Sequence, residues 1–210
     1  MIRPGDAILD VGCHPGGWTQ VSVEEVGDEG LVIGVDIKST SPIEGATVLQ
    51  GNIIYKETIE RIEELLDGGQ FNIVLSDISP KLTGRYDTDQ AISLELSTMT
   101  LDVAMDLLAP GGALVTKIFQ GVGIEGLIKA AKDRFSNVQR FAPMASRNSS
   151  SETYLICRNR LPIPRRPARG LTAFEQVLGH LTEVGINVDE TSTEDEEIEI
   201  TKGFRRLNRK

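Results

Sequence analysis

Short apolar runs alternate with amphipathic helical patterns over the first 160 residues, and this alternation constrains the fold more than any other feature of the chain. Such alternation predicts an α/β fold with a mostly parallel sheet and helices on both of its faces. The last two runs have no helical pattern between them, so we expect a closing hairpin whose last strand is antiparallel. The candidate strands are Ala7–Val11, Leu31–Asp36, Ala46–Gln50, Phe71–Ser76, Ala113–Lys117, Val138–Phe141 and Thr153–Arg158. The candidate helices are Trp18–Val26, Glu57–Leu66, Thr88–Leu108 and Ile124–Phe135.

The composition is typical of a soluble globular domain. Of the 210 residues, 40% are hydrophobic and 25% are charged, and no apolar stretch approaches the roughly 18 residues that a membrane span needs. No charged, apolar leader precedes the first strand, and Cys13 and Cys157 make no disulfide framework. We therefore expect a cytoplasmic monomer that binds no membrane. The formal net charge of −9 allows a nucleic-acid partner only through a local basic patch.

A glycine-rich turn, Asp10-Val-Gly-Cys-His-Pro-Gly-Gly-Trp18, follows the first candidate strand and opens the first helix. In an open α/β sheet this is the position of a nucleotide-binding loop, where glycine lets the backbone approach a ligand closely. The spacing is not the GxGxxG of a dinucleotide site, and Pro15 and Trp18 crowd the helix N-terminus that a pyrophosphate needs. The loop therefore favours a cofactor without phosphates, S-adenosylmethionine (SAM), over the nicotinamide cofactor of a dehydrogenase.

Charged residues stand where later strands end or begin at the same edge of the predicted sheet. Asp36 ends the second strand, where an acid commonly binds ribose hydroxyls. Asp77 follows the fourth strand, Lys117 ends the fifth, and Glu152 opens the last. A lysine inside the apolar run Ala-Leu-Val-Thr-Lys-Ile-Phe is hard to explain as a surface charge, and burial prepares an amine to accept a proton.

Together these motifs resemble the FtsJ/RrmJ family of SAM-dependent RNA ribose 2′-O-methyltransferases, and within it the enzymes that act on a uridine of large-subunit ribosomal RNA. The likeness covers Met1 to about Arg160 and is specific, because the loop, the Asp, the Lys and the Glu follow in family order. It implies a Rossmann-like SAM-dependent methyltransferase fold with a seven-stranded sheet. The segments that carry it are Asp10–Gln20, Gly34–Asp36, Leu49–Asn52, Ser76–Gly84, Leu108–Gly112, Lys117–Gly121 and Ser146–Tyr154.

The resemblance also implies a role for individual residues. Asp77, Lys117 and Glu152 match the last three members of the family's Lys-Asp-Lys-Glu catalytic tetrad. The first lysine of that tetrad belongs to a helix upstream of the first strand. The sequence given starts at Met1-Ile-Arg-Pro-Gly-Asp6, so we expect that helix and its lysine to be missing from it, and neither Lys38 nor Lys81 stands in the matching place. The residues expected at SAM are Asp10, Gly12, Pro15, Gly16, Gly17, Trp18, Asp36, Asn52 and Asp77.

Within that set, Gly16 and Trp18 are expected to flank the methionine part of SAM, Asp36 to hold the ribose, and Asp77 to lie beside the methyl group. Asn52 stands where the family often has an Asp near the adenine, and its amide can still hydrogen-bond the base. The histidines His14 and His180 have no metal-ligand neighbours in the sequence, so we expect no metal.

The expected reaction transfers the SAM methyl group to a ribose 2′-OH of RNA, at a uridine of large-subunit ribosomal RNA in the assembled subunit. Lys117 would accept the hydroxyl proton. RNA phosphates are expected to contact Lys81, Arg85 and Arg147, and Tyr86 to stack on a base. Two alternatives stay open: a transfer-RNA or messenger-cap ribose methyltransferase, and a catalytically silent SAM- or RNA-binding module.

The composition changes after residue 160, which predicts three parts. Residues 1–160 form the expected catalytic domain. Residues 161–170, with three prolines and three arginines, are expected to be an extended linker. Residues 171–210 are expected to form a tail with one amphipathic helix, Ala173 to about Val184, followed by a mobile acidic run and a basic end.

Overall fold

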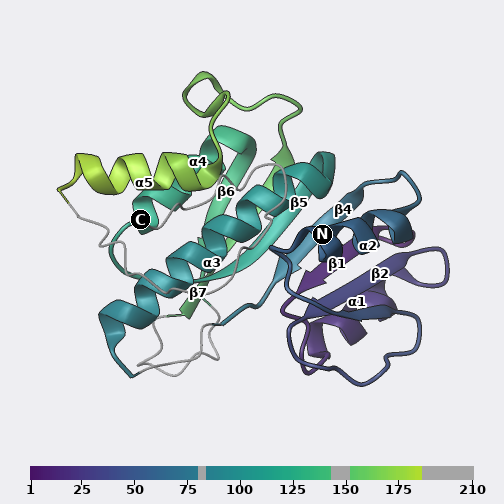
Figure 1. Cartoon of the computed structure of the whole chain (residues 1–210). Coiled ribbons are helices and arrows are strands. Elements are labelled where there is room, and N and C mark those ends of the chain that lie inside the picture. Colours follow the sequence, from purple (N-terminus) through teal and green to yellow (C-terminus); the bar gives the residue numbers. More distant parts are fainter. Residues whose placement is uncertain (80–83, 143–151, 186–210) are drawn as a thin grey trace.

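A seven-stranded sheet is the centre of the computed structural model, which describes residues 1–79, 84–142 and 152–185. Its strands are β1 (Ala7–Val11), β2 (Leu31–Asp36), β3 (Thr47–Gln50), β4 (Phe71–Ser76), β5 (Leu108–Phe119), β6 (Phe135–Phe141) and β7 (Glu152–Arg160). They lie in the order β3-β2-β1-β4-β5-β7-β6 (Figure 1). β1 to β5 pair in parallel, whereas β7 is antiparallel to both β5 and β6. The predicted parallel sheet with an antiparallel closing hairpin is therefore confirmed.

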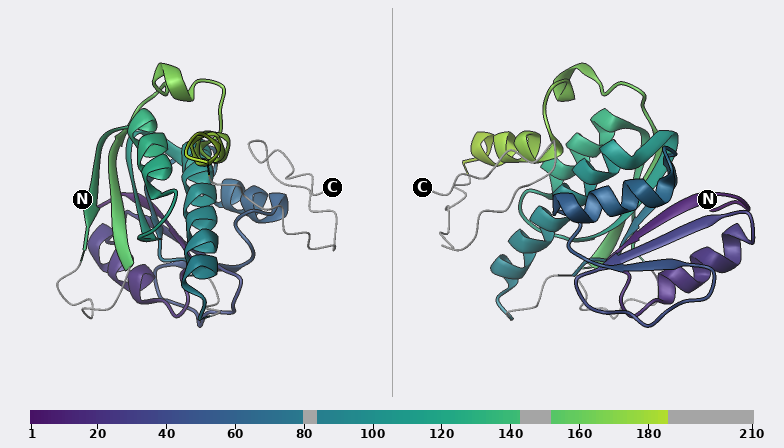
Figure 2. Two further views of the ribbon diagram at one scale, coloured as in Figure 1. Left: turned by 90° about the vertical axis from the view of Figure 1, so that its left-hand side faces the viewer. Right: turned by 45° about the vertical axis from the view of Figure 1, so that its right-hand side comes forward.

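Helices cover both faces of this sheet (Figure 2). They are α1 (Gly17–Val26), α2 (Lys56–Leu66), α3 (Tyr86–Leu107) and α4 (Ile124–Arg134). Because successive strand residues point to opposite faces, Ile8 and Val32 pack with Val26 of α1. Their neighbours Leu9 and Ile33 belong to the larger core that α2, α3 and α4 cover. The expected helices on both faces are thus present.

A fifth helix, α5 (Ala173–Glu183), packs on α3 and α4 and matches the helix predicted for the tail. It begins with a capping box, in which Thr172 and Glu175 bind each other's backbone N–H groups. Ala173 and Val177 are buried in the larger core. The chain before it, expected to be an extended linker, includes a 3₁₀ turn at Arg166–Ala168. The predicted acidic run and basic end lie outside the described residues.

Two strands begin three or more residues before their predicted starts, whereas the other element bounds lie within two residues of the prediction. β5 begins at Leu108 rather than Ala113, because Leu108 pairs with Phe71 before a register shift in the ladder. β6 begins at Phe135 rather than Val138, because it pairs with β7 from that residue, so α4 ends at Arg134. Both extensions depend on partner strands that a local sequence pattern does not contain. Within the described ranges, no helix is long and apolar enough to cross a bilayer.

Candidate functional site

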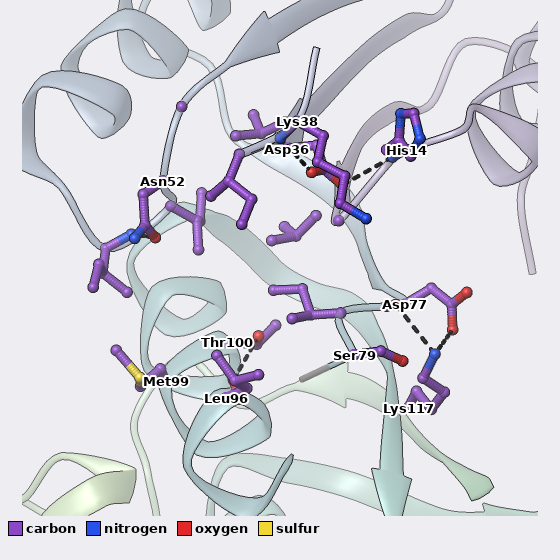
Figure 3. Close-up of a pocket in the computed structure, with 18 residues that line it drawn as sticks. His14, Asp36, Lys38, Asn52, Asp77, Ser79, Leu96, Met99, Thr100 and Lys117 are labelled. Carbon is purple, nitrogen blue, oxygen red and sulfur yellow. Dashed lines mark hydrogen bonds and ion pairs between the residues drawn. The ribbon is translucent and has the colours of Figure 1, made fainter. Parts of the chain in front are cut away.

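A cavity of about 390 Å³ lies at the edge of the sheet where the parallel strands end. The chain reverses its strand order between β1 and β4, and ligands of open α/β sheets bind at such a switch point. Residues from the ends of β1 to β4, from β5 and from α3 line the cavity (Figure 3). The lining residues include Gly12, Asp36, Asn52, Asp77 and Lys117, together with Leu96, Met99 and Thr100 of α3.

The glycine-rich loop begins at the end of β1, where its backbone lies close to the chain that follows β4. Gly12 has φ +79°, and a Cβ there would lie 2.8 Å from Ile78 Cγ1 and 3.0 Å from the Ile78 backbone nitrogen. At Gly16, with φ +119°, a Cβ would lie 2.7 Å from Ile43 Cδ1. Both glycines are therefore required by a left-handed backbone and by close neighbours.

Asp36 is fixed at the end of β2 by backbone donors. The His14 N–H donates to Asp36 Oδ2 at 3.0 Å, and the Lys38 N–H donates to Asp36 Oδ1 at 2.7 Å. Each carboxylate oxygen can accept a second hydrogen bond, and Asp36 lines the cavity. Asn52 lies in the loop after β3, where its Oδ1 accepts from the Ile54 N–H at 3.3 Å. The two residues offer an anionic acceptor and an amide to the same cavity.

Asp10 is buried behind the loop and does not line the cavity. Thr19 Oγ1 donates to its Oδ2 at 2.6 Å, whereas Oδ1 has no hydrogen-bond partner among the described residues. Burial raises the pKa of Asp10 to about 6 against the opposing effect of the Thr19 hydrogen bond, and the charges of Asp77 and Asp36 raise it further. Asp10 therefore ties β1 to α1 from a buried position beside the cavity lining.

Lys117 and Asp77 form an ion pair at the cavity wall. Lys117 Nζ lies 2.8 Å from Asp77 Oδ1 and donates to the Asp77 backbone oxygen at 3.2 Å. The lysine side chain is 8% exposed and the aspartate side chain 36%. The amine and the carboxylate expected from different strand ends are thus brought together, with the carboxylate open to the solvent side.

Glu152, the third expected catalytic residue, opens β7 with its backbone paired to Phe119. Its side chain lies outside what the structure describes. Two residues further on, Tyr154 is paired with Lys117 across the strands. The Tyr154 hydroxyl donates to Asp77 Oδ1 at 3.4 Å, which adds a site residue that sequence reasoning missed. The pairing of neighbouring strands could have revealed it, because Tyr154 lies opposite Lys117 in the β5–β7 ladder.

Five of the residues expected at SAM are not among those that line the cavity: Asp10, Pro15, Gly16, Gly17 and Trp18. The Trp18 ring instead lies against the Tyr154 ring, with centroids 5.6 Å apart. Both rings pack on the cluster that α1 covers. The α3 residues of the cavity were also missed, because a helix that is apolar along much of its length does not reveal which residues face a ligand.

Comparison with known proteins gives a consistent result. The family model for FtsJ-like methyltransferases matches residues 1–160. Curated relatives named ribosomal RNA large subunit methyltransferase E include one from Natronomonas pharaonis, 40% identical over 79% of this chain and 65% of the relative. A second, from Methanothrix thermoacetophila, is 42% identical over 79% of this chain and 64% of the relative. This chain thus spans slightly less than two thirds of the length of these relatives.

Solved structures agree on the fold. A Plasmodium falciparum protein described as a ribosomal RNA methyltransferase superposes with a TM-score of 0.69 at 29% identity, over 77% of this chain and 90% of that one. A Streptococcus mutans protein described as a methyltransferase, in complex with SAH, superposes with a TM-score of 0.51 at 11% identity, over 75% of this chain and 88% of that one. At that identity the second likeness concerns the fold alone.

Proposed function

The chain belongs to the FtsJ-like methyltransferase family, and from this membership we propose that it transfers a methyl group from SAM to a ribose 2′-hydroxyl of RNA. We propose a uridine of large-subunit ribosomal RNA in the assembled subunit as the substrate, which the names of the relatives support. The observation that carries the proposal is the buried Lys117 amine, 2.8 Å from Asp77 Oδ1 at the wall of a cavity that Asp36 also lines.

The chemistry of the cavity fits SAM. Asp36 offers carboxylate oxygens to a ribose diol, and Asn52 offers an amide to an adenine edge. Ile53 and Ile54 supply apolar wall beside Asn52. Asp77 places negative charge in the cavity, which suits a sulfonium. When bound, SAM supplies an electrophilic methyl carbon on a positively charged sulfur.

The loop residues outside the cavity have a supporting role in this proposal. Asp10 and Thr19 hold the start of α1 against β1. Gly12 lets the chain after β4 pass close to β1, so that Asp77 reaches the cavity. Pro15, Gly16, Gly17 and Trp18 shape the turn that faces the methionine part of SAM.

Lys117, Asp77 and Glu152 carry the chemistry that we propose. The ribose hydroxyl is a poor nucleophile until its proton is accepted, and a positioned base contributes roughly 10²–10⁴-fold. The ion pair holds the Lys117 nitrogen at Asp77. The amine must release its proton to solvent before it can accept the hydroxyl proton, and the transfer of the methyl group to the ribose oxygen leaves S-adenosylhomocysteine. Asp77 then balances the charge of the protonated amine, and Glu152 orients the amine from β7. Alignment of the hydroxyl oxygen with the methyl carbon provides the remaining acceleration.

The charge of the chain supports an assembled particle as the substrate. A net charge of −9 gives no broad positive surface for naked RNA. Of the expected RNA contacts, Arg85 and Tyr86 lie at the start of α3, while Lys81 and Arg147 lie outside the described residues. The Tyr86 hydroxyl donates to the Gln120 backbone oxygen at 2.6 Å, and the residue is 58% exposed, so its ring is available for stacking. We propose further that the protein acts as a cytoplasmic monomer.

A labelled methyl group tests the proposed function. The chain is incubated with large ribosomal subunits that lack the modification and with SAM carrying a deuterated methyl group, and the RNA is digested to nucleosides for mass spectrometry. We expect the label in 2′-O-methyluridine. Label on a base, label only when transfer RNA replaces the subunits, or no label although calorimetry detects SAM binding would each contradict the proposal.

A further inference from the structure

Strands β4 and β5 separate at the place where the ion pair forms. Their ladder ends at the pair Ser76↔Thr116. Beyond it, the Asp77 N–H donates to the Val11 backbone oxygen of β1 at 3.2 Å, so the chain after β4 turns toward β1. β5 continues to Phe119, paired with β7. The peptide groups of Lys117 and Phe119 that face the resulting gap therefore need partners other than β4.

Two serines of α3 supply these partners. The Ser97 hydroxyl lies 2.9 Å from the Lys117 backbone oxygen and 2.8 Å from the Ser93 backbone oxygen, and shares its proton between them. The Phe119 N–H donates to Ser93 Oγ at 3.3 Å. Both serines are at most 4% exposed. They lie four residues apart, so they face the same strand from successive turns of the helix.

The position of the Lys117 backbone decides where its amine lies. The amine reaches back across the gap to both the Asp77 carboxylate and the Asp77 backbone oxygen. Without the Ser97 hydroxyl, the Lys117 carbonyl would depend on the longer hydrogen bond from the neighbouring Thr116 hydroxyl, at 3.3 Å, and the peptide would turn toward that donor or admit water. Either change would move the amine away from Asp77, and a displacement of about 1 Å in a catalytic group can cost roughly 100-fold in rate.

We infer that Ser97, assisted by Ser93, is a positioning residue that holds Lys117 in register for methyl transfer. This inference rests on the proposed function. It goes beyond it by assigning a task to two helix residues that lie outside the tetrad and do not line the cavity. The separation of β4 from β5 opens the sheet for the amine, and the α3 hydroxyls replace the hydrogen bonds that the missing ladder would have made.

Thr98 provides a matched control on the same helix. It is 1% exposed, and its hydroxyl donates to the Leu94 backbone oxygen of its own helix at 2.7 Å. Thr98→Val therefore removes one buried α3 hydroxyl without touching β5, whereas Ser97→Ala removes the one that binds Lys117. Loss of a buried hydroxyl in general would affect both variants alike.

The experiment compares the two variants in two assays. In single-turnover methyl transfer to large ribosomal subunits, Ser97→Ala should lower the rate roughly 10- to 100-fold with the KM for SAM changed by less than about threefold, while Thr98→Val stays near the parent. In acetylation by a water-soluble acylating reagent, followed by mass spectrometry, Lys117 of Ser97→Ala should react several-fold faster, with exposed Lys129 as the internal standard.

Each outcome decides one of the two claims. If Ser97→Ala matches Thr98→Val in both assays, the positioning role is wrong. If the parent transfers no methyl group, the proposed function fails, and the acetylation assay alone decides whether Ser97 fixes Lys117. If Ser97→Ala does not fold, Ser93→Ala takes its place: it should speed hydrogen exchange of the Phe119 amide and acetylation of Lys117, and unchanged rates of both would overturn the inference.

Discussion

At the scale of single residues, Gly12 leaves no space for a side chain beside Ile78. Gly12→Ala adds a Cβ against Ile78 and strains a φ of +79°, so we expect a loss of about 2–4 kcal/mol in the free energy of unfolding, together with weaker SAM binding. Urea unfolding and calorimetry measure the two effects.

Gly68→Ala is the control for this substitution. Gly68 has φ +78°, but an added Cβ would meet nothing within 4 Å. It should cost only the left-handed strain, about 1–2 kcal/mol, and leave SAM binding intact. Equal losses in the two variants would show that the contact with Ile78 is unimportant.

Asp10 makes stability depend on pH. Burial raises its pKa from the ordinary 3.8 of an aspartate to about 6, so the folded state favours the protonated form between these values. The ionised form costs stability above pH 6, by at most about 3 kcal/mol, and this cost is relieved as the pH falls from about 7 to about 4. Asp10→Asn should therefore flatten the dependence of the unfolding free energy on pH.

Urea titrations at pH 5 and pH 7.5 measure this difference. Burial also raises the pKa of Asp102 to about 6, and that contribution is common to both proteins. A pH dependence that is the same in the parent and in Asp10→Asn would show that Asp10 does not titrate in this range.

At the scale of elements, Asp102 of α3 fixes the first turn of α5. Its Oδ1 accepts from the Ala173 N–H at 2.5 Å and its Oδ2 from the Phe174 N–H at 3.1 Å. Asp102→Ala leaves these buried donors without the carboxylate, so we expect a loss of about 2–3 kcal/mol and faster hydrogen exchange throughout α5. Glu95→Ala, at an exposed position on α3, should change neither. Protected α5 amides in Asp102→Ala would mean that its packing alone holds the helix.

The elements also show what the sequence can and cannot predict. Lys117 and Asp77 were found because each stands at the end of an apolar run, and parallel strands end at one edge. Ser93 and Ser97 were missed because the sequence pattern of α3 does not indicate which strand the helix packs against. The repeat of small hydroxyl residues at 93, 97 and 100 is the local signal that could have indicated a polar contact with the sheet.

At the scale of the whole molecule, the alternation of strands and helices was sufficient to predict the layers and the closing hairpin. It did not predict that α5 would join the core of the first 160 residues, because that depends on the long-range contacts of Asp102 and Arg134. The Arg134 guanidinium, which is buried, donates to the Leu171 backbone oxygen and to Gln176 Oε1. These bonds tie the chain after residue 160 to α4.

The most direct test of the account is the methyl-transfer rate of Lys117→Ala on large ribosomal subunits, measured beside its affinity for SAM. We predict a fall of at least about 100-fold in rate with the SAM affinity changed by less than about threefold, while Lys129→Ala, an exposed change on α4, retains the parent rate. A Lys117→Ala protein that methylates at the parent rate would contradict the central claim that this amine carries the reaction.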